Sequence, residues 1–145
     1  MMSVTLNWGD RLPDGKRFEL VLGEEAVLDR ETGLTWERKP DHSEVKKWHE
    51  AIIISYQKVI GGRKGWRLPS VEELLSLVDV TRSAPALPAG HPFLGISSYG
   101  YWTATSVVNA QGQGWVVNIG SGETDTDNKQ SGLFVWAVRG GNGLM

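Results

Sequence analysis

The residues that could do chemistry are not spaced for a catalytic site. His42 and His49 lie seven residues apart and could share one face of a helix, but no third ligand is close to them in the sequence. His91 precedes Pro92 in a proline-rich stretch, and solvated or capping roles are favoured for all three histidines. No nucleophile-elbow motif and no paired-carboxylate motif occurs. The sequence therefore predicts no catalytic residue and no enzyme activity.

Two segments could bind ions. Hard cations such as calcium prefer carboxylate and amide oxygens, and one glycine-flanked stretch carries Glu123, Asp125, Asp127 and Asn128. A solvated acidic loop is the favoured alternative, so we expect no cofactor, with calcium the one metal that these four residues could bind. The turn at residues 61–65, Gly-Gly-Arg-Lys-Gly, lacks the ending of a phosphate-binding loop and follows a predicted helix, which indicates an ordinary turn.

Composition narrows the class of protein further. The chain has 145 residues, a net charge of −2 and no cysteine. One domain is expected at this length, with no electrostatic reason to bind nucleic acid or a membrane surface and no disulfide or thiolate chemistry. No segment has the roughly 20 apolar residues of a membrane span. Residues 1–8 lack the pattern of a signal peptide, so we expect a soluble protein that is cytoplasmic or virion-associated.

Two helices are predicted in the first half. The first is expected to begin at Asp41 or Ser43 and to end near Ile60, before two glycines. Its apolar stripe is Val45, Trp48, Ile52, Tyr56 and Val59. The second follows Pro69, with Ser70 and Glu73 spaced as a capping box. Its apolar stripe is Val71, Leu74, Leu75 and Val78.

Strands are predicted on both sides of these helices. Residues 18–28 alternate around Gly23 and Glu24 as a hairpin, and a short strand covers 34–36. From Tyr99 the period is two, with strands expected near 101–105, 115–119 and 133–138 and polar loops at 109–114 and 120–132. The predicted class is α+β, with two helices packed on a twisted antiparallel sheet with long surface loops.

Several short motifs occur in a characteristic order. They are Thr32-Gly33-Leu34-Thr35-Trp36, Trp48 with Ala51, Gly65-Trp66-Arg67-Leu68-Pro69, Glu73-Leu74, Leu77-Val78-Asp79, Tyr101-Trp102-Thr103-Ala104-Thr105, Trp115-Val116-Val117 and Val138-Arg139-Gly140-Gly141. From about residue 17 to residue 141 this order closely resembles the DUF1566 family, named for the C-terminal domain of a Legionella collagen-like adhesin. The resemblance implies a C-type-lectin-like fold related to formylglycine-generating enzymes and a binding or adhesion function. Similar domains are variable proteins of diversity-generating retroelements, including phage and viral receptor-binding proteins.

The chain departs from this family at two positions. The family usually has one cysteine in the first helix and another in the last strand, which would pair. Here the matching positions are Ser55 and Ala137. Their joint loss is expected if they form one bond and the protein matures in a reducing compartment. The related sulfatase-modifying oxidase also needs cysteines, so the resemblance does not extend to that activity.

The seven tryptophans fall into two groups. Trp36, Trp48, Trp66, Trp102 and Trp115 have core-facing phases or belong to the motifs. Trp136 has the opposite phase to Val135 and Ala137, which leaves either burial under a loop or subunit, or an exposed anchor for a ligand. With the anchor, rigid aromatic and adaptable polar residues would form one recognition surface. Its predicted members are Tyr99, Tyr101, Thr103, Gln111, Gln113, Val116, Asn118, Phe134 and Trp136.

These observations predict a non-enzymatic binding module. Residues 1–16 are an arm or strand, residues 17–96 a scaffold, and residues 97–138 the ligand-binding sheet and loops. The expected partner is a protein or glycan on a cell surface, without membrane insertion, and a homo-oligomer is open. The sharper hypothesis is a variable receptor-binding protein of a diversity-generating retroelement on a phage or virus particle. A carbohydrate-binding adhesin domain is the alternative, and an enzyme of the formylglycine-generating type is disfavoured.

Overall fold

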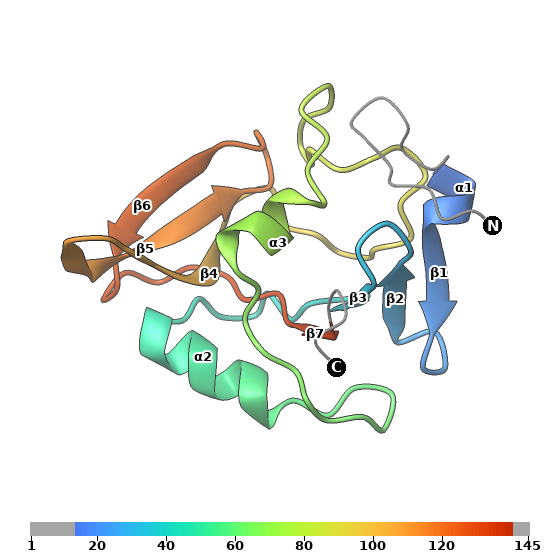
Figure 1. Ribbon diagram of the computed structural model, residues 1–145, viewed down its shortest axis with the longest axis horizontal. Coiled ribbons are helices and arrows are strands. Elements are labelled where there is room, and N and C mark those ends of the chain that lie inside the picture. The colour runs from blue at the N-terminus through green and yellow to red at the C-terminus, as the bar shows by residue number, and fades with distance from the viewer. Residues whose placement is uncertain (1–13, 141–145) are drawn as a thin grey trace.

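The computed structural model describes residues 14–140 and contains two antiparallel sheets and short helices (Figure 1). The helices are α1 (Asp14–Arg17), α2 (Trp48–Gln57) and α3 (Val71–Leu75). The strands are β1 (Phe18–Val21), β2 (Ala26–Asp29), β3 (Leu34–Glu37), β4 (Gly100–Val107), β5 (Ala110–Asn118), β6 (Thr124–Asn128) and β7 (Val138–Gly140). The α+β class is confirmed. The predicted N-terminal arm lies mostly outside the described residues, and its last residues, from Asp14, begin α1 rather than a strand.

The first sheet has the strand order β1-β2-β3-β7. The predicted hairpin is confirmed, because β1 and β2 pair around a turn in which Leu22, Gly23 and Glu24 all have positive φ. The last strand of the chain then returns to pair with β3, with Trp36 opposite Val138 and Thr35 opposite Arg139. This sheet therefore joins the two ends of the described chain.

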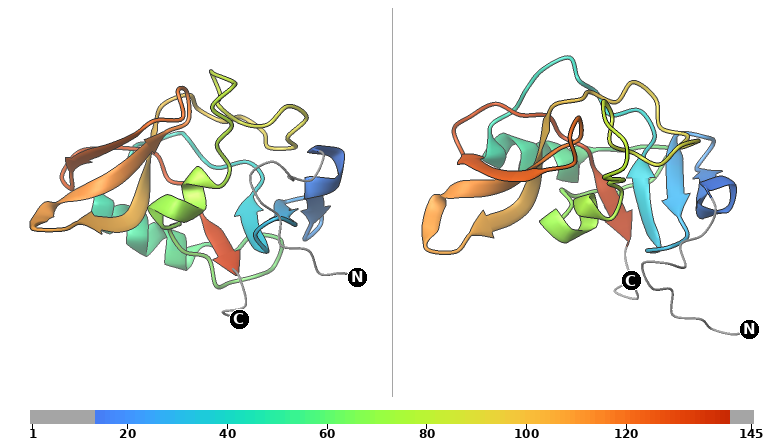
Figure 2. Two further views of the ribbon diagram at one scale, coloured as in Figure 1. Left: turned by 45° about the horizontal axis from the view of Figure 1, so that its top comes forward. Right: turned by 90° about the horizontal axis from the view of Figure 1, so that it is seen from above.

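The second sheet has the order β4-β5-β6 and lies at the other end of the molecule in all three views (Figures 1 and 2). The prediction of a loop over residues 120–132 is wrong at β6, which pairs with β5 from Gln113 opposite Asn128 to Val117 opposite Thr124. The sequence hides this strand because an edge strand exposed to water needs no alternating apolar residues. The loop predicted at 109–114 is also largely strand, since β5 begins at Ala110.

The prediction of a regular strand over residues 133–138 is wrong for all but its end. Only Val138–Gly140 pairs continuously. Leu133 and Phe134 instead form single bridges to Lys46 and Tyr101, on two different parts of the molecule. Residues 135–137, which lie between these bridges and β7, are not part of a strand. The rule that alternate residues face opposite sides of a sheet therefore does not hold there.

Helix α2 begins later than predicted. Asp41 accepts a hydrogen bond from the Ser43 amide at 2.8 Å and forms a local turn, not a helix cap. At the true start, the Glu50 carboxylate accepts from the Lys47 amide at 2.9 Å. The predicted stripe is also wrong for Val45, Tyr56 and Val59, which are more than half exposed, as is Ile53. The buried face carries the small residues Ala51 and Ser55, which allow the helix to pack closely.

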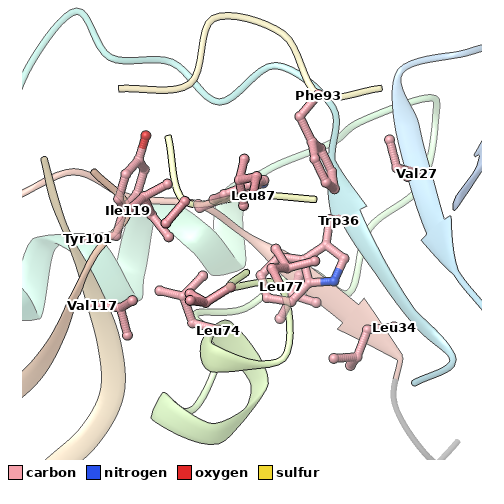
Figure 3. Packing of buried hydrophobic residues seen from close by; sticks show 14 residues of the cluster. Val27, Leu34, Trp36, Leu74, Leu77, Leu87, Phe93, Tyr101, Val117 and Ile119 are labelled. Atoms are coloured by element: carbon pink, nitrogen blue, oxygen red, sulfur yellow. The ribbon is translucent and has the colours of Figure 1, made fainter. Parts of the chain in front are cut away.

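Helix α3 confirms the predicted capping box. The Ser70 hydroxyl accepts from the Glu73 amide at 3.1 Å, and Glu73 accepts from the Ser70 amide at 2.8 Å. The helix is only five residues long, but Leu74 within it and Leu77 after it are fully buried. Both side chains lie between the residues of the two sheets (Figure 3). The stretch that contains α3 therefore fills the space between the sheets.

Candidate ligand-binding surface

The structure does not gather the nine predicted ligand-binding residues on one surface. Tyr101, Thr103 and Trp136 are fully buried and Val116 is 6% exposed, so these four residues cannot present a surface to a ligand. Thr103 donates to the backbone oxygen of Trp115 at 2.8 Å. The physical reason is that both faces of the second sheet are covered near β4, one by the α3 segment and one by α2 and residues 133–135.

Trp136 is part of an aromatic cluster, and the exposed-anchor hypothesis is wrong. Its ring centroid lies 5.5 Å from that of Trp36, 4.9 Å from Phe93 and 5.7 Å from Tyr101. Its indole Nε1 donates to the backbone oxygen of Glu37 at 2.9 Å. Burial of Trp36, Trp66 and Trp102 is confirmed, whereas Trp48 and Trp115 are half-buried.

The other five predicted ligand-binding residues lie in separate parts of the structure. Gln111 and Gln113 are near the β4–β5 turn, whereas Asn118 ends β5 and Tyr99 precedes β4. Seven residues of extended strand separate Gln111 from Asn118 by about 23 Å. Phe134 is half-buried, with its ring 4.9 Å from that of His42. Tyr99 is the aromatic member of the set that is well exposed, at 68%.

Tyr99 belongs to a surface that the structure forms at the end of the second sheet. The backbone oxygen of Tyr99 accepts from the Ile119 amide at 3.0 Å, which places it beside the β5–β6 turn. On the other side of this turn is Val80, whose side chain is 79% exposed. A Cβ atom placed on Gly122 would lie 3.9 Å from Val80. We call this the loop-end surface, made of the exposed residues Val80, Tyr99, Ser121, Glu123 and Thr124.

The loop-end surface rests on a dense set of backbone hydrogen bonds. The loop after α3 is attached to the turn by the amides of Ala84 and Ala86, which donate to Gly120 and Ile119 at 2.8 and 2.6 Å. That loop and the β5–β6 turn lie together at the upper edge of Figure 1. These hydrogen bonds satisfy backbone groups of both segments and so hold the exposed side chains on a common frame.

The half-buried Asn118 stabilises this frame. Its side-chain oxygen accepts from the amides of Gly120 and Ser121 at 2.8 and 3.1 Å. Its backbone amide donates to Glu123 at 2.8 Å, and its backbone oxygen accepts from Gly122 at 2.6 Å. Gly122 has φ +84°, a conformation in which glycine is unstrained. Asn118 therefore has a structural role in the turn, and its contact with a ligand stays a prediction.

The Tyr101 side chain holds the segment that leads to Tyr99 in place. The Tyr101 hydroxyl accepts from the Ser97 amide at 2.9 Å and lies 2.6 Å from His42 Nε2. It points away from Val117 and Leu74 (Figure 3). Burial lowers the pKa of His42 and raises the pKa of Tyr101, so both side chains are neutral near pH 7. No local pattern indicates this role of His42, because the contact joins residues 59 positions apart.

The four calcium candidates lie along β6 and the turn before it. Asp125 accepts from the Thr126 amide, and Asp127 accepts from the Asn128 amide and the Ser131 hydroxyl, at 2.7 to 2.8 Å. Residues two apart on one face of a strand are separated by about 6.6 Å. Among residues 14–140 there is no group of three or more histidine, aspartate or glutamate side chains that could hold a metal ion. The candidates thus do not converge on one ion.

The fold, the loop-end surface and a comparison with known families together indicate the family to which this chain belongs. Two open antiparallel sheets are linked by short helices and long loops, and the exposed side chains of one loop end are held on a rigid frame. In the described part of the chain, no helix has the length and apolar character to span a membrane. A family model of the Lcl C-terminal domain matches residues 25–139, and the chain belongs to this family. A search of curated proteins found no match.

Proposed function

We propose that the chain is an adhesin-like, non-enzymatic binding module that recognises a protein or glycan through the loop-end surface. Membership of the Lcl C-terminal domain family supports an adhesin-like role. We choose the loop-end surface because Tyr99 is 68% exposed there. It lies beside a turn that is held by backbone hydrogen bonds and by hydrogen bonds to Asn118. Aromatic side chains on a rigid frame lose little entropy on binding, and they contribute much of the energy at recognition surfaces.

We further propose that the fold is C-type-lectin-like. The pairing of β3 with β7 supports this proposal, since it brings the first and last strands of the described chain into one sheet. The separate β4-β5-β6 sheet supports it as well, because long loops leave it on the side of the molecule away from β1 (Figure 2). In this arrangement one sheet closes the domain and the other carries the ligand.

The test compares two tyrosines that are equally exposed. Tyr99 is 68% exposed on the loop-end surface, and Tyr56 is 66% exposed on α2. Binding of the wild type, Tyr99→Ala and Tyr56→Ala is measured on a glycan array and on whole cells, with and without calcium. We expect Tyr99→Ala to reduce binding by about tenfold or more, as loss of an interface anchor does, and Tyr56→Ala to leave it unchanged. The reverse result, or equal losses, would assign binding to another surface.

The array also separates the two ligand classes. Sugar binding that needs calcium supports a carbohydrate-binding adhesin. Binding to cells that protease treatment abolishes, with no response on the array, supports a protein ligand. In both cases the loop-end surface predicts the same loss in Tyr99→Ala.

A second candidate is a variable receptor-binding protein of a diversity-generating retroelement. The observation that favours it is the separation of exposed side chains from a backbone frame, since Tyr99, Ser121 and Glu123 can vary without disturbing the core. Sequencing of related genomic copies is expected to show substitutions at these positions and none at Tyr101 or Trp136. The gene would lie beside a reverse transcriptase and an imperfect repeat of the coding segment. Absence of both would exclude this candidate.

A further inference from the structure

An open groove of about 660 Å³ lies between β3, β7 and the start of α3. Its lining includes Thr35 of β3 and Arg139 of β7, which are directly opposite each other in the sheet. Opposed residues on antiparallel strands have their side chains on the same face, roughly 5 Å apart at Cβ. The groove shares no residue with the loop-end surface, and its chemistry is independent of the proposed function.

Arg139 brings a positive charge to this groove, and no partner for it is found in the part of the chain that the structure describes. Its Nε is buried and has no hydrogen-bond partner. None of the ion pairs among residues 14–140 includes Arg139. Its Cζ lies 5.9 Å from the centroid of the buried Trp66 ring. A Cβ atom on Gly65 would lie 3.6 Å from Arg139 Nη2, so the guanidinium rests between the indole and a glycine. Within residues 14–140, the guanidinium is therefore positioned by packing, and its Nε has no acceptor.

The other two charges in the groove neutralise each other. Arg67 binds Glu73 through two parallel hydrogen bonds, Nη1 to Oε1 at 2.7 Å and Nη2 to Oε2 at 2.9 Å. Arg67 Nη2 also donates to the backbone oxygen of Gly140 at 2.9 Å. With this pair satisfied, the groove has a net charge of +1 from Arg139. A single positive charge matches a ligand with one negative charge.

We propose that this groove binds a carboxylate group, with Arg139 as its charged donor and the Thr35 hydroxyl as a second donor. A planar guanidinium and a planar carboxylate form two parallel hydrogen bonds, a geometry that an ammonium does not offer. The Thr35 side chain is half-buried on the same face and lines the groove. The carboxylate belongs either to a free small acid or to an acidic side chain of a larger molecule.

The experiment follows the side-chain Nε–H signal of Arg139 by nuclear magnetic resonance. The wild type is titrated with sodium acetate, with an acetylated and amidated Gly-Glu-Gly peptide, and with inorganic phosphate. We expect a saturable shift with acetate and peptide and a weaker response to phosphate. Equal affinity for acetate and peptide indicates a small acid as the ligand, and tighter peptide binding indicates an acidic side chain. No saturable shift, or tighter binding of phosphate, would overturn the proposal.

Variants of Arg139 and Thr35 test whether these two residues bind the carboxylate. Arg139→Gln removes the charge and is expected to weaken carboxylate binding by about tenfold or more, and Arg139→Lys to weaken it too because the planar fork is lost. Thr35→Val removes one donor at constant volume and is expected to weaken binding several-fold. Arg63→Gln makes the same charge change at an exposed residue outside the groove and is expected to have no effect. If Arg139→Gln fails to fold, the wild-type titration and Thr35→Val decide, and unchanged affinity in Thr35→Val and Arg139→Lys would overturn the proposal.

Discussion

Trp136 shows how strongly a single buried ring can contribute to this fold. It contacts three other aromatic residues and donates a hydrogen bond to the backbone of Glu37. Replacement of such a residue by alanine leaves a large cavity and an unpaired carbonyl. Burial in this cluster means that its effect on any ligand would be indirect.

We therefore expect Trp136→Ala to lower the free energy of unfolding by about 3–5 kcal/mol. The measurement is urea denaturation followed by far-ultraviolet circular dichroism. Tyr56→Ala serves as the matched control, since Tyr56 is 66% exposed and its loss should cost little. A Trp136→Ala protein as stable as the control would show that the ring is not part of the core.

Glu37 is a buried carboxylate with two distinct partners. Burial raises its pKa, and this effect is opposed by Lys58, whose Nζ lies 3.0 Å from Oε2. The other oxygen accepts from the Ala137 amide at 2.7 Å. This hydrogen bond ties β3 to the segment that leads into β7.

Two variants separate the charge of Glu37 from its hydrogen bond. Glu37→Gln removes the charge but retains an oxygen that can accept from Ala137, whereas Glu37→Ala removes both. We expect Glu37→Ala to be less stable than Glu37→Gln by about 1–3 kcal/mol, the cost of an unsatisfied buried amide. Denaturation of both variants at pH 7 provides the comparison. Equal stabilities would mean that water replaces the lost acceptor.

At the scale of elements, β6 and the turn before it are the least expected part of the fold. Five polar residues form this strand only because β5 supplies a row of backbone partners. Asn118 sets the geometry of the turn by accepting two amide hydrogen bonds with one side-chain oxygen. The loop-end surface depends on that turn.

Asn118→Ala is expected to destabilise the protein by about 1–2 kcal/mol, because two turn amides lose their acceptor. Hydrogen exchange at Gly120 and Ser121 should accelerate in this variant. Asn118→Asp keeps the oxygen and should retain slow exchange. If alanine leaves exchange at both amides unchanged, the turn is held by its backbone bonds alone.

In helix α2, the face that is buried differs in part from the apolar stripe predicted from the sequence. The apolar stripe predicted this face only in part. Trp48 and Ile52 pack against the core as expected, but Tyr56 is exposed, and the fully buried residues of the helix are Ala51 and Ser55. The Ser55 hydroxyl donates back to the Ala51 carbonyl at 2.8 Å, which satisfies it inside the helix. Two small residues thus decide which side of α2 is buried.

For the whole molecule, burial of histidines links stability to pH. Burial lowers the pKa of both His42 and His91 below the ordinary value of 6.5. The unfolded chain therefore binds protons first as the pH falls. The stability that comes from keeping these rings neutral is complete above about pH 6.5 and decreases below it until the folded-state pKa values are reached.

Between pH 7 and pH 5, we expect the histidines to make the free energy of unfolding of the wild type fall relative to that of the double variant His42→Gln, His91→Asn. The raised pKa of Glu37 acts in the opposite direction, but equally in both proteins. The asparagine oxygen can replace His91 Nδ1 as the acceptor of the Phe93 amide, which is now 3.2 Å away. Urea denaturation at half-unit pH steps gives both curves. Parallel curves for wild type and variant would show that these rings do not cause the dependence.

The sequence by itself determined the local features of this protein. The β1–β2 hairpin, the capping box of Ser70 and Glu73, the α+β class and the family all followed from short-range patterns. Such features depend on residues that are near one another in the chain, so propensity, spacing and turn chemistry suffice to predict them. Burial of Trp36, Trp66 and Trp102 was predictable for the same reason.

Only the tertiary structure decided which side chains reach the surface. Trp136 and Tyr101 are buried because segments from residues 36 and 42 cover them, and no local period encodes that cover. The strand β6 exists through its partner β5, and the pairing of Thr35 with Arg139 joins positions more than one hundred residues apart. Contacts of this range are set by the packing of the whole chain, and both candidate binding surfaces are made from them.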